Sequence, residues 1–553
     1  MPRWSRRLER WLRGPPRVVF HPEYRLPLPS FAARTGMDPR RAEEALDALV
    51  ELGVLGEDDA LVPESAAWAD LARVHDPAWL EALTQPAGPA AVFAVDPWEV
   101  GDGVVDSVRR ACGGTLLAAR AAVAARAAVL NLAGGFHHAR RDRGVAYCAI
   151  NDVAVAVAAL RAEGFAGEVA VLDFDAHPPD GIADCLGDSA WIGSVSGDRW
   201  PAPPGVVEVA VPAGCDDARY LRAVEQVLSR RPHADLCIVI AGGDVREGDK
   251  HGGLAVSEAG ARQRDMLVAE SLAGVPSAWL PAGGYREDSW RLLAGTALVL
   301  AGHGDVDIPT HLDPVRARFR RVGRGLRLDE LGGELDLTAS DLDDLLSGRP
   351  PAEPRLLGAY SAAGVELALD RYGLLEPVRR LGYAGLRVEL APVELGDRFR
   401  VYGWARGAEY LLAESVLARE VADGEAWIFV HWLTLRHPLG AFPAGKSPLP
   451  GQEVPGLGLA REAFELHRRI AERLGCAGVR MRPMYLHVAY AVRERMRFID
   501  PQEQAEFERI LDTYRDVSLP ELSRQAAAGE LRLDGQPWRW RAGVMQERVG
   551  AGG

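Results

Sequence analysis

The segment from Val169 to Asp180 constrains the fold more than any other part of the chain. It reads Val-Ala-Val-Leu-Asp-Phe-Asp-Ala-His-Pro-Pro-Asp, an apolar run that ends in acidic residues and a histidine. Side chains of an extended strand alternate between its two faces, so Asp173, Asp175 and His177 point the same way where the strand stops. Three polar groups on one face of a buried strand are costly unless something pairs them. The pattern therefore predicts a buried strand whose carboxyl end holds a metal.

Three further segments repeat this design, each with an apolar run, a glycine pair and then a polar residue. They are Ala128 to His138, Leu236 to Asp244 and Ala278 to Tyr285. In open α/β sheets, functional sites form beyond the carboxyl ends of parallel strands. We therefore expect an α/β domain in which four strands bring their polar ends to one rim.

Residues 17–308 resemble the histone deacetylase superfamily of zinc-dependent deacylases, because four of its motifs occur in the same order. The motifs are Gly134-Gly-Phe-His-His138, Tyr147-Cys-Ala-Ile-Asn-Asp152, Gly243-Asp-Val-Arg-Glu-Gly-Asp249 and Gly283-Gly-Tyr285. The stretch from Gly242 to Gly253 and the Ala-His pair after Asp175 look most like the class IV branch. The resemblance implies the arginase/deacetylase-type fold, a parallel sheet flanked by helices.

The resemblance also implies a catalytic metal site formed by Asp175, His177 and Asp244. Three protein ligands leave an open position for water and substrate, as a catalytic zinc site requires. A zinc ion there would make its water more acidic and polarise the substrate carbonyl. Two carboxylates and one imidazole form a hard ligand set, so Fe²⁺ is the alternative metal.

Proton transfer is assigned by the same resemblance to a pair of histidines. His138 would act as general base and then as general acid, while His137 helps to hold charge. Asp173 would orient His137, and Asp180 would orient His138. Tyr285 would donate a hydrogen bond to the developing oxyanion.

The substrate channel is likewise implied by the resemblance, at Phe136, Ala146, Tyr147, His251 and Gly284. Ala146 stands where the family commonly has glycine, and His251 lies in a segment that lines the channel mouth in relatives. These departures concern the acyl group and its carrier.

The loop before Asp180 departs from the family pattern more strongly. It contains Pro178 and Pro179, where relatives usually have His or Gln followed by Gly. Two prolines remove backbone donors and fix φ. The position of Asp180 is therefore the feature that separates an active enzyme from a decayed relative.

Composition agrees with a cytoplasmic enzyme of two domains. The chain has 553 residues, enough for two sizeable cores, and a net charge of −14, which argues against nucleic acid as a partner. Its six cysteines show no paired spacing and no signal peptide is recognised, so we expect a reducing compartment. No apolar run is long enough to span a bilayer.

Residues 1–16 form a basic amphipathic segment, with Trp4, Leu8, Trp11 and Leu12 at helical spacing. We expect a short helix packed on its own protein, with peripheral contact to an anionic membrane surface as the alternative. Residues 39–52 read as an amphipathic helix that stops at Gly53. Residues 309–355 read as an acidic, Gly/Pro-rich connecting segment that carries a short helix, with acidic Leu-Asp-Asp runs around 341–346.

Residues 356–553 predict a second, α+β domain. Strands are expected at 386–390, 398–404, 410–421 and 426–435, followed by a helix at 459–474, a strand at 478–482 and a helix near 488–497. This order resembles the N-acetyltransferase fold, with Glu453, Gly456 and Gly458 in the place of the pyrophosphate loop of that fold. Acetyl-CoA binding is the weaker expectation, because Glu453 would repel a pyrophosphate; a silent binding or dimerisation domain is favoured.

The function predicted from the sequence is metal-dependent hydrolysis of an N-acyl amine, either an acyl-lysine or a small acylated amine. A catalytically silent acyl-amine sensor that signals through the second domain is the alternative from a different class. A bifunctional deacylase and acetyltransferase is the third. The sequence leaves acyl length and oligomeric state open.

Overall fold

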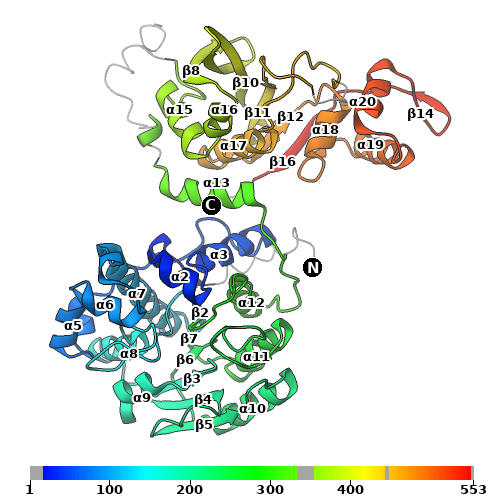
Figure 1. Ribbon diagram of the computed structural model, residues 1–553. Coiled ribbons are helices and arrows are strands. Elements are labelled where there is room, and N and C mark those ends of the chain that lie inside the picture. The colour runs from blue at the N-terminus through cyan, green and yellow to red at the C-terminus, as the bar shows by residue number, and fades with distance from the viewer. Residues whose placement is uncertain (1–16, 328, 333–353, 443–447, 550–553) are drawn as a thin grey trace. The chain divides into compact units, whose positions relative to one another are not determined.

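The computed structural model describes residues 17–327, 329–332, 354–442 and 448–549 (Figure 1). The chain divides into two compact units, Met1–Leu312 and Asp313–Gly553. The helix expected in 1–16 and the acidic runs around 341–346 lie outside the described residues. Among the helices that are described, none is both long enough and apolar enough to cross a membrane.

The first unit contains a seven-stranded sheet in which every neighbouring pair is parallel. The four segments expected to be strands are confirmed as β2, β3, β6 and β7, and they are adjacent in the sheet. Their carboxyl ends therefore meet at one rim. In sheet order the strands are β1 Val18–Val19, β2 Ala128–Asn131, β7 Ser277–Leu280, β6 Leu236–Ile240, β3 Val169–Asp173, β4 Trp191–Gly197 and β5 Val206–Val211.

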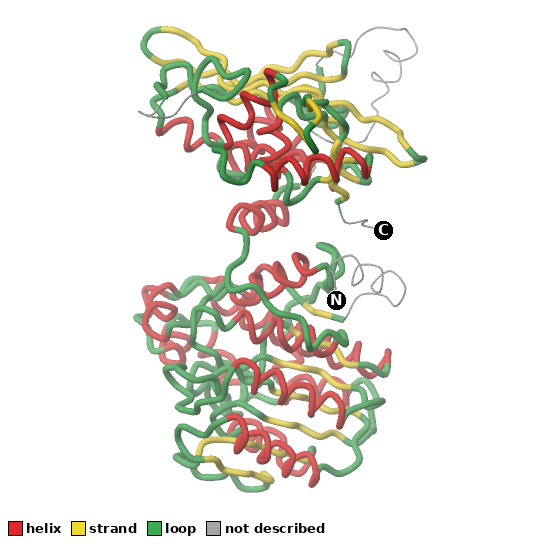
Figure 2. Tube along the Cα trace, turned by 90° about the vertical axis from the view of Figure 1, so that its right-hand side faces the viewer, coloured by secondary structure: helices red, strands yellow, loops and turns green. Residues whose placement is uncertain are grey.

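Helices cover both faces of this sheet, and each face forms its own apolar core (Figure 2). On β3, Ala170 and Leu172 belong to one core, whereas Val169 and Val171 belong to the other, as strand alternation requires. The first core includes helices α3 Arg41–Leu52, α10 Asp217–Arg230, α11 Glu258–Ser271 and α12 Trp290–Leu300. The second includes α2 Pro29–Thr35, α4 Trp68–Leu71, α5 Pro77–Leu83, α6 Ala87–Phe93, α7 Asp102–Ala125, α8 Asp152–Ala162 and α9 Asp180–Leu186. Three-residue 3₁₀ helices occur at Pro22–Tyr24, Pro97–Glu99 and Gly187–Ser189.

Helix α3 matches the helix expected over residues 39–52. It ends at Gly53, whose φ of 77° lies in the left-handed region that glycine adopts at helix ends. All six cysteines are buried and free, in agreement with the absence of paired spacing.

The second unit contains a mixed seven-stranded sheet with α17 among the helices of its core. In sheet order the strands are β13 Arg497–Phe498, β16 Met545–Arg548, β12 Gly478–Met481, β11 Glu425–Leu435, β10 Ala408–Ala422, β9 Gly396–Ala405 and β8 Ala384–Val393. A separate hairpin pairs β14 Leu531–Leu533 with β15 Gln536–Trp538. The helices are α13 Pro314–Gly325, α15 Ala362–Arg371, α16 Leu375–Arg380, α17 Ala460–Arg473, α18 Leu486–Val492, α19 Pro501–Thr513 and α20 Leu519–Ala528, with a 3₁₀ turn at Asp329–Leu331.

The order of elements expected for this unit is found, with one correction. The helix expected near 488–497 ends at Val492, because Arg497 and Phe498 pair with Gln546 and Met545 of β16. Within the predicted connecting segment, α13 packs into the core of the second unit through Val315 and Phe319. The domain boundaries at 308 and 355 and the acetyltransferase-like character stay predictions.

Candidate active site

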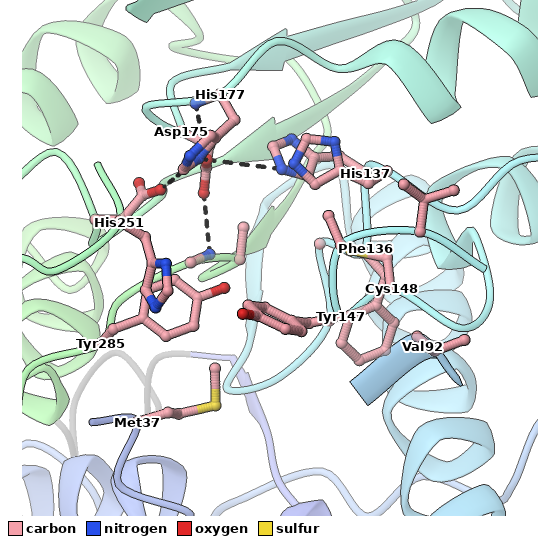
Figure 3. Close-up of a pocket in the computed structure, with 18 of the residues that line it drawn as sticks. Met37, Val92, Phe136, His137, Tyr147, Cys148, Asp175, His177, His251 and Tyr285 are labelled. Carbon is pink, nitrogen blue, oxygen red and sulfur yellow. Dashed lines mark hydrogen bonds and ion pairs between the residues drawn. The ribbon is translucent and has the colours of Figure 1, made fainter. Parts of the chain in front are cut away.

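The carboxyl ends of β2, β3, β6 and β7 meet at a cavity of about 1310 Å³. Asp175, His177 and His137 lie on one side of this cavity, and Tyr285, Tyr147 and His251 lie across from them (Figure 3). The cavity is also lined by His138, Asp180 and Asp244. Asp173 lies behind His137 and is completely buried. The structure thus brings together the metal-ligand and catalytic residues expected from the sequence.

The three expected metal ligands form a compact group whose ligand atoms all lie within 4.8 Å of one another. His177 Nδ1 lies 3.1 Å from Asp175 Oδ1 and 2.9 Å from Asp244 Oδ2. The second oxygen of each carboxylate accepts a backbone hydrogen bond, from Gly283 N–H for Asp175 and from Ala176 N–H for Asp244. These bonds fix how the ligands face one another. A Cβ atom at position 283 would lie 2.7 Å from Asp175 Oδ2, so the close approach of the β7 loop requires glycine.

The charges of this group fit a bound dication. Asp175 and Asp244 are 1 % and 0 % exposed and face each other across His177. Burial and the Asp175 carboxylate raise the pKa of Asp244 above its ordinary value. Against the effect of burial, hydrogen bonds to Asp175 and Asp244 raise the pKa of His177 to about 11. Two buried carboxylates therefore need a positive partner here, and a divalent metal satisfies that need with the oxygen and nitrogen ligands that zinc accepts.

Each histidine of the pair is bonded to its own carboxylate. His137 Nδ1 lies 2.8 Å from Asp173 Oδ2, and His138 Nδ1 lies 2.6 Å from Asp180 Oδ1. The two imidazole rings are 4.1 Å apart, and the His138 ring is 5.8 Å from that of His177. Both histidine–aspartate pairs expected from the sequence are therefore present, and the Pro178-Pro179 loop does not displace Asp180.

The environments of the two histidines differ. Burial acts against the charge of His137, but the Asp173 and Asp175 carboxylates raise its pKa to about 9. Burial and the neighbouring His137 lower the pKa of His138. Two adjacent imidazoles thus differ in their tendency to carry a proton, which is the arrangement expected where one group holds charge and the other exchanges protons.

The turn that carries the histidines is held by Asp152, which the sequence reasoning did not single out. Its buried carboxylate accepts hydrogen bonds from Gly135 N–H at 2.9 Å, from Phe136 N–H at 2.7 Å and from Thr115 Oγ1 at 2.5 Å. The neighbouring Asn151 caps α8 and donates to the Ala139 carbonyl. The signal was present in the Asn-Asp pair that closes the second motif.

Tyr285 is positioned from behind by Asp249 and Arg41. Asp249 Oδ2 accepts a 2.7 Å hydrogen bond from Tyr285 N–H, and the Arg41 guanidinium donates to the carbonyls of Ala282 and Gly284. Burial raises the pKa of Tyr285 well above its ordinary value, so its hydroxyl remains a hydrogen-bond donor.

The expected channel residues Phe136, Ala146, Tyr147 and His251 line the cavity. Ala146 has a φ of 45°, in the left-handed region, which explains why glycine suits that position. Gly284 is corrected, because it does not line the cavity: its carbonyl faces Arg41. The His251 ring lies 4.4 Å from that of Tyr285, and its buried Nε2 has no hydrogen-bond partner among the residues that the structure describes.

Trp200 and Arg140 are among the cavity residues that the sequence reasoning missed. Trp200 lies in a Pro-rich loop after β4 and places its ring 5.8 Å from that of His177. Arg140 follows the histidine pair and donates to Asp180. The Trp-Pro-Ala-Pro-Pro-Gly sequence was the available signal for the first, because an aromatic residue in a stiff loop beside a sheet rim suits a binding wall.

The predicted pyrophosphate loop of the second unit does not offer the charge that such a ligand needs. Glu453 forms a 3.0 Å ion pair with Arg436, so the guanidinium of Arg436 is already paired with a carboxylate. Gly458 has a φ of 75°, just before α17 begins at Ala460. The Glu453 carboxylate would repel phosphate, so acetyl-CoA binding at Glu453, Gly456 and Gly458 stays the weaker expectation.

Residues 35–299 match the family model of the histone deacetylase domain. An uncharacterized protein of Picosynechococcus is 32 % identical over 305 residues, which cover 52 % of this chain and 98 % of the relative. Histone deacetylase 2 of Arabidopsis thaliana is 31 % identical over 277 residues, which cover 46 % of this chain and 71 % of that protein. Among solved structures, an acetylpolyamine aminohydrolase from Burkholderia pseudomallei superposes with a TM-score of 0.43 at 23 % identity, over 52 % of this chain and 99 % of that one.

Proposed function

This chain belongs to the histone deacetylase family, and we propose that it is a metal-dependent deacylase that hydrolyses the amide of an N-acyl amine. The carriers that we propose are an acylated lysine of a protein or a small acylated amine. The parallel sheet flanked by helices is the arginase/deacetylase-type fold. Similarity to the class IV branch stays a proposal based on the Gly242–Gly253 motif.

One arrangement carries this proposal. His137 and His138 line the same cavity as the three expected metal ligands and Tyr285, and each of the two histidines is hydrogen-bonded to its own aspartate. Burying carboxylates and imidazoles costs free energy unless these groups pair or form hydrogen bonds with one another. Binding an acyl amine would not require two such pairs, whereas amide hydrolysis requires a proton to be removed from water and delivered to the leaving amine.

The residues divide the chemistry as follows. When a zinc ion is held by Asp175, His177 and Asp244, it supplies Lewis acidity at the acyl carbonyl. His138 accepts the proton of the attacking water and passes it to the leaving nitrogen. His137, fixed by Asp173, stabilises negative charge beside it.

Tyr285 completes this set from the opposite side of the cavity. Its hydroxyl donates a hydrogen bond to the carbonyl oxygen as that oxygen becomes negative. Arg41 and Asp249 hold the loop that carries Tyr285, so the donor is in place before the reaction begins.

The experiment that tests this proposal combines metal analysis with hydrolysis of acyl-lysine peptides and acylated polyamines. The variants are His138→Ala and Tyr285→Phe, with His233→Ala as the control because His233 is an exposed histidine with 82 % side-chain exposure. Zinc near one per chain, and activity lost in the first two variants only, would support the deacylase. The alternative, a catalytically silent acyl-amine sensor, predicts that the zinc-loaded wild type binds these compounds without turnover. Activity restored by Fe²⁺ rather than Zn²⁺ would identify the other metal.

For the second unit we propose a catalytically silent binding or dimerisation role. The ion pair of Glu453 with Arg436 argues against a bifunctional deacylase and acetyltransferase. Equilibrium dialysis of the full chain with acetyl-CoA tests this directly, and binding at micromolar concentration would restore the bifunctional alternative. Sedimentation velocity on the same sample measures self-association.

A further inference from the structure

The two histidine–aspartate pairs of the site differ in what holds the second oxygen of the carboxylate. For Asp173, Oδ2 faces His137 and Oδ1 accepts a 3.0 Å hydrogen bond from the backbone N–H of Asp175. For Asp180, Oδ1 faces His138 and Oδ2 accepts a 2.8 Å hydrogen bond from the Arg140 guanidinium. One carboxylate is thus fixed by the backbone and the other by a side chain.

The backbone on both sides of Asp180 explains this difference. Pro178 and Pro179 have no N–H to offer, and the N–H of Asp180 is already bonded to the Pro178 carbonyl at 2.9 Å. The N–H that corresponds to the Asp175 donor is that of Ile182, two residues after Asp180, and it is bonded to the His137 carbonyl at 3.0 Å instead. A carboxylate with one unrestrained oxygen can rotate away from its histidine, so a second donor from elsewhere is needed.

Arg140 is well placed to supply that donor. It lies two residues after His138, in a segment closed by a 2.9 Å hydrogen bond from Arg140 N–H to the Arg143 carbonyl. The buried His75 fixes the same segment, because its Nε2 accepts from Asn151 N–H and its Nδ1 therefore donates to the Arg140 carbonyl. His138 and Arg140 thus approach Asp180 from one rigid segment.

We propose that Arg140 is a positioning residue for the deacylation reaction, which fixes the Asp180 carboxylate so that it holds the His138 imidazole in one orientation and one tautomer. This inference rests on the proposed function and extends it to a residue outside the metal site. The Arg140 and Asp180 side chains are 35 % and 26 % exposed, so their ion pair contributes little to folding stability. The effect of its loss should appear in catalysis.

Kinetics of Arg140→Gln and Arg140→Lys test the proposal. The matched control is Arg143→Gln, because Arg143 pairs only with the adjacent Asp142 among the described residues and both side chains are more than half exposed. We expect kcat of Arg140→Gln to fall roughly 10- to 100-fold, as for other groups that orient a catalytic residue, with KM changed less than about twofold. Arg140→Lys should recover most of the rate, and Arg143→Gln should match the wild type.

An Asp180→Asn background separates positioning from substrate contact. If Arg140 acts through Asp180, adding Arg140→Gln to Asp180→Asn causes no further loss. Losses that multiply, or a loss confined to KM, would mean that Arg140 contacts the substrate and would overturn the proposal. A wild-type kcat in Arg140→Gln would overturn it as well.

A second readout does not depend on turnover. The Nδ1 protons that His137 and His138 share with their aspartates should give two downfield resonances in the proton NMR spectrum, and His138→Asn identifies one of them by its loss. Arg140→Gln should shift or broaden that resonance alone. If the zinc-loaded wild type hydrolyses no acyl amine, the proposed function fails, and an unchanged His138 resonance would independently overturn the role of Arg140.

Discussion

Replacing Gly181 by alanine should separate catalysis from folding. Gly181 is the second residue of α9, directly after Asp180. A Cβ atom there would lie 2.3 Å from the carbonyl carbon of His138 and 2.5 Å from the carbonyl oxygen of Ala139. Non-bonded carbon atoms normally approach to about 3.5 Å, so α9 and the histidine segment must separate by about 1 Å.

The consequence for the reaction follows from the 2.6 Å bond between His138 Nδ1 and Asp180 Oδ1. A displacement of about 1 Å lengthens it beyond hydrogen-bonding range, and misplacement of that size costs about 100-fold in rate. We expect kcat to fall roughly 10- to 100-fold, about 1.4 to 2.7 kcal/mol of transition-state stabilisation. Stability should change less, because overpacking costs about 1 to 3 kcal/mol while alanine adds about 1 kcal/mol of helix propensity.

The assay is steady-state hydrolysis with urea unfolding and zinc content measured on the same samples. Gly101→Ala is the matched control, because a Cβ atom at Gly101 would meet nothing within 4 Å. A wild-type kcat in Gly181→Ala would show that the new methyl group is accommodated without moving Asp180, and our reasoning would be refuted. An equal loss in Gly101→Ala would refute it too.

Three further predictions concern other parts of the molecule. Tyr285→Phe should lower kcat about 100- to 1,000-fold with little change in KM or melting temperature, measured by kinetics and calorimetry, because only the oxyanion donor is removed. Chelation of the metal should abolish hydrolysis and lower the melting temperature, since a ligand present at 1,000 times its Kd stabilises the folded state by about 4 kcal/mol; added zinc should reverse both effects. Burial lowers the pKa of His467 to about 4, below its ordinary 6.5, so protonation favours the unfolded state. The stability that neutral His467 contributes is complete above pH 6.5 and is lost as pH falls toward 4, about 2 kcal/mol by pH 5; His467→Leu should flatten this part of the urea-unfolding profile.

Much of the sheet of the first unit could be predicted from the sequence, because the patterns that identify its strands are local. Apolar runs followed by glycine pairs identify β2, β3, β6 and β7, and the parallel order then brings Asp175, His177 and Asp244 together. Strands β4 and β5 lack such endings and were not anticipated. The sequence did not predict the contact of Gly284, whose carbonyl accepts a hydrogen bond from Arg41 instead of lining the channel.

The remaining differences depend on contacts between distant residues. Arg140 donates a hydrogen bond to Asp180, which is 40 positions away in the sequence. Trp200 contacts His177 from a loop that follows a different strand. The residues after Val492 suit a helix locally, but pairing of Arg497 with β16 decides their structure. Neither periodicity nor residue type reports such contacts, because the partner is chosen by the fold.

Because all six cysteines are buried, their reactivity in denaturant reports which part of the chain unfolds first. Cys476 lies in the second unit, whereas Cys112, Cys148, Cys185, Cys215 and Cys237 lie in the first. A thiol reacts with an alkylating reagent only when it is reached and ionised, so each label marks a local or global opening. In a denaturant series, unfolding of the second unit as a whole adds one tag, at Cys476, and unfolding of the first adds five together, whereas local opening tags single cysteines. Mass spectrometry that locates each tag therefore ranks the stabilities of the two units without any engineered probe.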